Sequence, residues 1–225
     1  MINLSLRLRT IASVVPSGAR VCDVGTDHAW LPIFLKLNNI AKSVIATDLN
    51  EKPLENAKRN IEQSGFCDIS LRLGDGLSSV QRAEVDTVII AGMGGEVITG
   101  ILSNCVWAKD QGLTFILQPT TSAEILREFL VTNGFEIISE TPVSENNKLY
   151  SIMKVVFQNK TVTKPHWFYY VGKIKPEGDG VLYIKKQQKR VFKCMTALEK
   201  VEPKQQEFSY YKEINDQLLK ILTEN

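Results

Sequence analysis

The sequence predicts an α/β fold: a mostly parallel, seven-stranded sheet wound with helices, followed by a small C-terminal helical hairpin. Apolar runs of strand length alternate with amphipathic stretches of helical period, the pattern of strand and helix units in a parallel sheet. The last two apolar runs are joined by a loop too short for a crossover helix, so one strand must be antiparallel. With 225 residues available, we assign residues 1–160 to the α/β domain and residues 161–225 to the hairpin.

The composition indicates a globular protein of the cytoplasm, and we expect it to be a monomer. Hydrophobic residues make up 44% of the chain and charged residues 23%, enough for a core and a solvated surface. No apolar run approaches the roughly 18 residues of a membrane span, and the first residues lack the apolar segment of a secretory signal. Two histidines and four widely separated cysteines favour reduced thiols over a metal site: Cys22, Cys67, Cys105 and Cys194.

A strand, a glycine turn and a helix near the N-terminus form the strongest candidate for a cofactor site. The pattern predicts a strand over residues 20–24, a turn at Gly25 and a helix that begins near residues 27–30. The unpaired N–H groups at the start of this helix would face a ligand bound above the turn. The second and third glycines of a dinucleotide-binding turn are missing, and Asp27 would repel a pyrophosphate. S-adenosylmethionine, which has no phosphate and carries an ammonium group, fits better. The alternative is an ordinary turn capped by Thr26 or Asp27.

The rest of the chain continues the alternation of strands and helices. In order, the pattern predicts a helix over residues 4–14, strands over 43–48, 69–73, 86–91 and 113–117, helices over 53–64 and 122–133, and antiparallel strands over 135–141 and 149–157. The strand over 86–91 is the most apolar, as expected for a strand buried on both faces.

The candidate binding residues of the α/β domain follow strands at their carboxyl ends, where open α/β sheets bind ligands. Asp48, with Leu49 beside it, stands where a doubly wound fold places a carboxylate against ribose hydroxyls. Asp75 and Gly76 follow the third strand, and a carboxylate there can accept a hydrogen bond from an adenine amino group. The other reading of Asp75 is a residue that favours a tight turn.

Two further strand ends complete this set. Ala91, Gly92 and Met93 let a ligand approach the backbone, and Met93 can pack on a flat ring. A glycine turn without a ligand is an equally open reading. Gln118 ends the fifth strand, and Arg7 on the first helix is a candidate phosphate contact if it lies near the turn.

The charge distribution points to a polyanion as partner of the C-terminal part. Residues 160–204 hold eleven Lys or Arg and four Asp or Glu, a net charge of +7, whereas the rest of the chain has a net charge of −5. Helices are predicted over residues 181–201 and 205–222, separated by Pro203. The first of these helices carries most of the cations: Lys185, Lys186, Lys189, Arg190 and Lys193. A solvated helix face is the simpler explanation for such a run in isolation.

Four motifs, taken together, resemble the bacterial tRNA (adenine(22)-N1)-methyltransferase family. They are DVGTDHAWLP at 23–32, RLGDG at 72–76, AGMGG at 91–95 and LQP at 117–119. The resemblance covers essentially the whole chain. It implies a class I, Rossmann-like methyltransferase fold that uses S-adenosylmethionine, with a C-terminal coiled-coil hairpin that helps to hold tRNA. The family usually has Tyr in place of Trp30 and Asn in place of Thr120, which puts the hydrogen-bonding role of position 120 in doubt.

The resemblance also assigns roles to individual residues. Cofactor contacts carried over by motif are Asp23, Gly25, Thr26, Asp27, His28, Asp48, Asp75, Gly76, Gly92 and Met93. For the base we expect contacts from Trp30 and Gln118. Adenine N1 is already a nucleophile, so the enzyme must mainly orient it and stabilise the cationic product. We expect the Asp27 carboxylate to do the latter.

Three other functions remain open on the sequence alone. A methyltransferase that acts on ribosomal RNA or on protein is the closest alternative, because the fold indicates the cofactor and not the acceptor. A tRNA-binding protein without catalytic activity would account for the basic hairpin but not for the strand-end residues. A nicotinamide dehydrogenase would use Asp48 in the same way, but the missing glycines argue against it.

Overall fold

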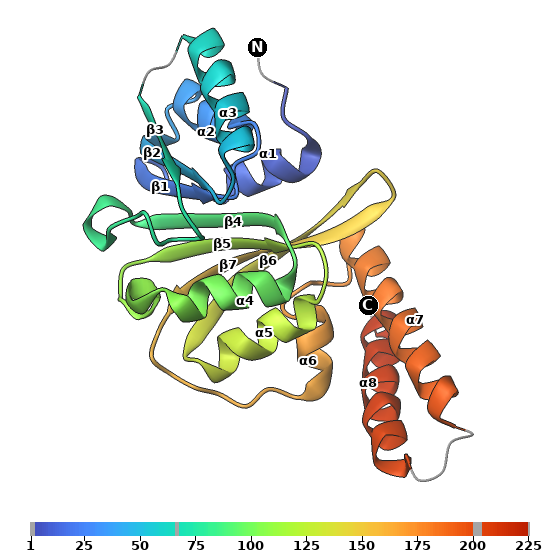
Figure 1. Ribbon diagram of the computed structural model, residues 1–225. Helices are drawn as coiled ribbons and strands as arrows, with labels where there is room; N and C mark the ends of the chain where they lie inside the picture. Colours follow the sequence, from blue (N-terminus) through green and yellow to red (C-terminus); the bar gives the residue numbers. More distant parts are fainter. Residues whose placement is uncertain (1–2, 66–67, 200–203, 225) are drawn as a thin grey trace.

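The computed structural model describes residues 3–65, 68–199 and 204–224, which form one seven-stranded sheet with helices on both faces and a helical hairpin (Figure 1). The strand order is β3-β2-β1-β4-β5-β7-β6, and β7 runs in the direction opposite to the other six strands of this sheet. The strands are β1 (Ala19–Val24), β2 (Ala41–Asp48), β3 (Ile69–Leu73), β4 (Thr87–Met93), β5 (Thr114–Pro119), β6 (Phe135–Glu145) and β7 (Lys148–Phe157). The predicted fold class is confirmed.

Eight α-helices accompany the sheet in the described part of the chain. They are α1 (Leu6–Ser13), α2 (Trp30–Leu37), α3 (Glu51–Ser64), α4 (Gly95–Asn104), α5 (Ala123–Thr132), α6 (His166–Val171), α7 (Asp179–Leu198) and α8 (Gln205–Thr223). Helices α1, α2 and α3 cover one face of the sheet, and α4, α5 and α6 cover the other (Figure 1). None of the described helices is long and apolar enough to cross a membrane.

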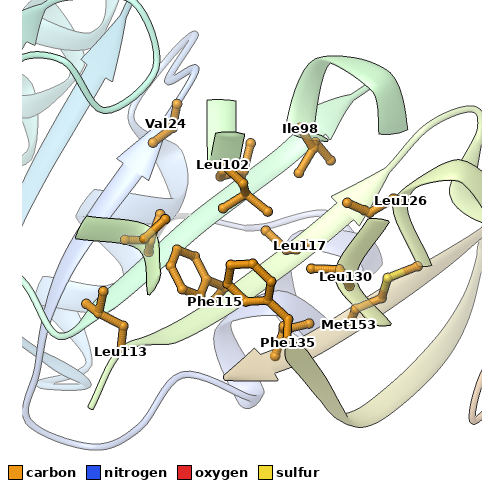
Figure 2. Packing of buried hydrophobic residues seen from close by; sticks show 14 of the residues in the cluster. Val24, Ile98, Leu102, Leu113, Phe115, Leu117, Leu126, Leu130, Phe135 and Met153 are labelled. Carbon is orange, nitrogen blue, oxygen red and sulfur yellow. The ribbon is translucent and has the colours of Figure 1, made fainter. Parts of the chain in front are cut away.

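The central strands are buried on both faces, as their composition predicts. In β4, Val88 and Ile90 point into the core under α4 and α5, whereas Ile89 points into the core under α1 and α2. In the core under α4 and α5, Phe115 meets Phe135 edge to face with ring centroids 5.9 Å apart (Figure 2). Burial of this apolar surface on both sides of the sheet is the main stabilising contribution to the fold.

Two helices, α4 and α6, are absent from the sequence-based prediction. Helix α4 contains two glycines and several β-branched residues, which lower its intrinsic propensity, and it begins directly after a glycine turn. Its first residue, Gly95, must be a glycine, because a Cβ atom there would lie 2.2 Å from the carbonyl oxygen of Ser122. Helix α6 has only six residues, too few for a helical period to be recognised.

The hairpin of β6 and β7 is longer than predicted. The loop expected over residues 144–148 is only a two-residue turn, in which Asn146 (φ 49°) and Asn147 (φ 61°) are both left-handed. Two such residues form the tight turn that matches the twist of the flanking strands. The extended hairpin projects beyond the rest of the sheet and contacts both α1 and α7 (Figure 1).

A buried ion pair joins the sheet to the C-terminal helices. The Arg127 Nε on α5 donates to Glu140 Oε1 on β6 at 2.9 Å, and both side chains are 0% exposed. Five more hydrogen bonds complete the network: Arg127 donates to the carbonyls of Tyr169 and Tyr170 and to the Tyr183 hydroxyl, and Glu140 accepts from the Ser151 hydroxyl and the Lys173 N–H. A buried charge pair with this many partners avoids most of the penalty of desolvation.

The C-terminal helices α7 and α8 pair side by side and form their own apolar core. This core includes Tyr183, Ile184 and Val191 of α7 and Ile214 and Leu218 of α8. Helix α6 contributes to both cores, because Phe168 and Tyr169 pack under the sheet while Tyr170 and Val171 pack against the hairpin. The predicted boundary between residues 160 and 161 therefore lies before an element that the two cores share. The predicted helix end at Val201 and Pro203, and Cys67, lie outside the described residues.

Substitution of Arg127 tests how much the buried Arg127–Glu140 network contributes to stability. We expect Arg127→Met to lower the free energy of unfolding by about 3–5 kcal/mol, because it leaves the Glu140 carboxylate buried without a cation. The measurement is urea unfolding followed by circular dichroism. The control is Arg20→Met, since Arg20 pairs with Asp86 at the surface, with side chains 40% and 39% exposed, and should cost about 1 kcal/mol or less. Equal losses in the two variants would contradict the assigned importance of the buried pair.

Candidate active site

The loops after β1 and β4 meet where the strand order reverses. Strand β1 lies between β2 and β4, and at such a reversal the helices leave to opposite faces and open a crevice at the carboxyl ends. Gly25 (φ 78°) and Gly92 (φ 84°) turn the chain there with left-handed backbones. A Cβ atom on Gly25 would lie 2.2 Å from Met93 Cε, so the two loops are in direct contact across the crevice.

The glycine turn after β1 is fixed from the side of β2. The N–H groups of Gly25 and Thr26 donate to the Thr47 carbonyl at 2.8 and 2.9 Å. The N–H groups of the turn itself are therefore not free to bind a ligand. Neither Thr26 nor Asp27 caps α2, because the helix begins at Trp30 and its N-cap residue is Ala29, which makes no side-chain cap bond.

Asp23 is a buried acid near the end of β1, two residues before Gly25. The residue is 8% exposed, and the Thr26 hydroxyl donates a hydrogen bond to its Oδ2. Burial raises the pKa of Asp23 to about 6, and the hydrogen bond from Thr26 opposes this shift. The negative charge of the Asp23 carboxylate is only partly compensated, because its hydrogen-bond partner Thr26 is neutral. A cationic group bound nearby would be stabilised by this carboxylate.

The ends of β2 and β3 lie together on one side of the crevice. The Gly74 N–H donates to the Asp48 carbonyl at 2.9 Å, and Asp48 Oδ1 accepts from the Asn50 N–H at 2.8 Å. Leu49 is 63% exposed, which leaves its apolar side chain free to cover a ligand. A pocket of about 480 Å³ begins at Asp75 and Gly76 and continues along α4. Its remaining lining is largely apolar and includes Leu77, Val80, Val97, Ile101 and Trp107.

The ends of β4 and β5 lie on the other side and connect to α1. Gln118 is fully buried, and its Oε1 accepts from the Gly92 N–H at 3.1 Å and from the Arg7 guanidinium. The Arg7 N–H donates to Glu145 Oε1 at 2.9 Å, and its guanidinium lies 5.7 Å from the centre of the Tyr150 ring. Arg7 and Gln118, both expected to contact substrate, thus form one network that holds the loop after β4.

Asp27, His28 and Trp30 form an exposed group at the mouth of the crevice. The Asp27 carboxylate lies 3.3 Å from His28 Nε2, and the two side chains are 70% and 46% exposed. The His28 and Trp30 rings are stacked, with centroids 6.3 Å apart and planes inclined by 27°. The described residues contain no group of three or more His, Cys, Asp or Glu arranged to hold a metal ion.

The basic residues of α7 lie on a different element from the crevice. All five are exposed: Lys185, Lys186, Lys189, Arg190 and Lys193. Arg190 differs from the lysines in its contacts, because it forms an ion pair with Glu124 of α5 and lies 5.6 Å from the centre of the Tyr170 ring. These contacts hold its half-exposed side chain against the α/β domain.

Several residues of the site escape the sequence-based prediction. Glu145 and Tyr150 hold Arg7 from the extended β hairpin, and the Asn60 amide donates to the His28 carbonyl at 2.9 Å. The pair Asn146 and Asn147 was the available signal for the longer hairpin, because asparagine tolerates the left-handed backbone of a tight turn. Asn60 gave no comparable signal, since its contact depends on how α3 packs beside the loop after β1.

Comparisons with known proteins agree with this architecture. A family model described as a methyltransferase domain matches residues 4–153. The tRNA (adenine(22)-N(1))-methyltransferase of Bacillus subtilis is 40% identical over 157 residues, which cover 68% of this chain and 64% of that protein. The likeness in sequence thus spans slightly less than two thirds of that relative.

Solved structures extend the likeness to the helical hairpin. The B. subtilis m1A22 tRNA methyltransferase TrmK has a TM-score of 0.84 and 29% identity, over 99% of this chain and 100% of that one. TrmK of M. capricolum in complex with S-adenosyl-homocysteine has a TM-score of 0.80 and 26% identity, over 97% of both chains. The chain therefore belongs to the methyltransferase family, whose model matches two thirds of its length, and it is similar in sequence and structure to the tRNA (adenine(22)-N(1))-methyltransferases.

Proposed function

We propose that the protein transfers a methyl group from S-adenosylmethionine to N1 of an adenine, position 22, in tRNA. The observation that carries the proposal is the contact between the glycine loops after β1 and β4 at the switch point of the sheet, next to the buried Asp23 at the end of β1. The name of the B. subtilis relative and the S-adenosyl-homocysteine complex of M. capricolum TrmK support it.

The residues around the crevice fit S-adenosylmethionine. Asp48 is placed to accept from ribose hydroxyls, and Asp75 to accept from the adenine amino group at the mouth of the apolar pocket. The apolar side chains of Leu49 and Met93 are available to pack against the adenine ring of the cofactor. Asp23 supplies negative charge near a bound ammonium group. When bound, the cofactor supplies a methyl group on a positively charged sulfur.

The loop after β4 is suited to orient the base. Gln118 fixes the Gly92 N–H, and the Met93 carbonyl accepts from the Thr120 N–H at 2.7 Å. A fixed loop at the switch point lets the protein hold adenine N1 in line for attack without rearranging at the moment of reaction. Thr120 takes part here through its backbone, which any residue at this position supplies, including the Asn that is usual in the family.

Asp27 is the proposed catalytic residue. Attack by N1 makes the adenine ring cationic, and a carboxylate beside the amino group stabilises this charge and accepts its proton. The exposure of Asp27, which lies in the loop after β1, supports this role, because its carboxylate is open to an entering base. Trp30, stacked on His28, adds an aromatic surface at the same point.

A direct assay of the acceptor tests the proposed function. We expect incubation with labelled S-adenosylmethionine and bulk bacterial tRNA to yield 1-methyladenosine, identified by mass spectrometry of the nucleosides. An A22→G transcript of a substrate tRNA is the matched control and should take up no label. Label on ribosomal RNA or protein, with none on tRNA, would overturn the proposed acceptor and leave the methyltransferase fold unaffected.

Substitution of Asp27 separates catalysis from folding. Asp27→Asn keeps the shape of the side chain and removes its charge, so we expect turnover to fall by about 100-fold or more. Thermal unfolding should stay near that of the parent, because the side chain is 70% exposed. Isothermal titration with S-adenosylmethionine shows whether cofactor binding is retained. Turnover within a few-fold of the parent would remove Asp27 from the reaction.

Charge reversal on α7 tests the tRNA contact of the hairpin. We expect Lys186→Glu, Lys189→Glu and Lys193→Glu together to weaken tRNA binding and to make its dependence on salt shallower by about two to three counterions. The matched control reverses three exposed lysines of the α/β domain, Lys42, Lys58 and Lys109, and should bind tRNA more nearly as the parent does. Unchanged binding by the hairpin variant at both low and physiological salt would contradict the prediction.

A further inference from the structure

We propose that a surface pocket on the flank of α3 binds a nucleotide of tRNA next to the methylated adenosine. The inference rests on the proposed function and names a second contact surface for the same substrate. The pocket has a volume of about 260 Å³ and is lined by His28, Asn56, Arg59, Asn60 and Gln63.

The lining of the pocket is polar and carries no carboxylate. Asn56, Arg59, Asn60 and Gln63 follow one another at helical spacing, so they form one continuous stripe on α3. The acidic residues of the helix lie off this stripe: Glu51, Glu55 and Glu62. Within the part of the chain that the structure describes, Arg59 has no ion pair and hydrogen-bonds only the Asn56 amide oxygen. Its charge is therefore available to an anion.

The pocket adjoins the proposed catalytic group. The Asn60 amide holds the His28 carbonyl at 2.9 Å, and His28 Nε2 lies 3.3 Å from the Asp27 carboxylate. Trp30, stacked on His28, is 41% exposed. Contacts thus link Asp27 and Trp30, through His28, to the stripe on α3. In this proposal, an RNA strand whose adenine reaches Asp27 continues along the stripe.

The chemistry of the stripe matches one nucleotide. A guanidinium binds a phosphate through two parallel hydrogen bonds, and amide side chains both donate to and accept from base edges and ribose hydroxyls. An exposed indole offers a stacking surface for an unpaired base. The alternative partner, an acidic protein segment, would need several cations to bind its carboxylates. This pocket has one arginine and three amide side chains, which fits a nucleotide better.

Alanine variants of the stripe test the pocket, and the same helix supplies the control. We expect Arg59→Ala to raise KM for tRNA by about tenfold, as for loss of a hydrogen bond to a charged group, and to lower the salt slope by about one. Gln63→Ala should raise KM by about threefold without a change in slope, because the lost group is neutral. For both variants kcat and the Kd for S-adenosylmethionine should stay at the parent values.

Lys58→Ala is the matched control, because Lys58 is an exposed cation beside Arg59 that does not line the pocket. It should leave KM for tRNA unchanged. The inference is overturned if Arg59→Ala has the KM of the parent, or if Lys58→Ala weakens tRNA as much as Arg59→Ala does. Filter binding of tRNA without cofactor gives the same comparison independently of turnover. A failure of the proposed function would show differently, as a parent protein that does not methylate tRNA at all.

Discussion

The reversal of strand order between β1 and β4 is the constraint on which the site depends. Since the chain leaves these neighbouring strands toward opposite faces of the sheet, no connection covers their carboxyl ends. The glycine loops occupy this opening, the carboxylates of Asp48 and Asp75 lie on the side of β2 and β3, and Gln118 lies on the side of β5. The two proposed sets of groups, for the cofactor and for the base, lie apart because the topology separates the strands that carry them.

Much of this arrangement can be predicted from the sequence, because it follows from two regular rules. A strand buried on both faces must be apolar throughout, which identifies β4. Ligands bind at the carboxyl ends of strands in open α/β sheets, which makes Asp48 and Asp75 candidates. The contacts that fix the loops are not predictable in this way. The bond from Arg7 to Gln118 joins residues 111 positions apart, and the Thr47 carbonyl takes up N–H groups that a local reading leaves free for a ligand.

Charge counting shows the same limit at the C-terminal hairpin. The sequence presents Arg190 and its neighbouring lysines as equivalent members of one basic run, and only packing distinguishes them. Arg190 is placed against Glu124 and the Tyr170 ring, where it helps to dock α7 on α5. A guanidinium suits this position because it combines a forked ion pair with contact to an aromatic face, whereas the flexible lysines remain in solvent. A net charge therefore identifies a basic region but not which of its residues are already engaged within the protein.

Helix α6 has a consequence for any attempt to exchange or remove the hairpin. Its residues fill two cores at once, and Gly172, which ends it, leaves room for Glu140: a Cβ atom there would lie 1.5 Å from Glu140 Oε2. A chain truncated after residue 160 would lack α6, so part of the sheet face under α6 would be exposed. The Arg127–Glu140 ion pair, which is buried in the full chain, would then be exposed to solvent. A shortened chain that keeps every partner of the buried pair must therefore extend into α7 as far as Tyr183.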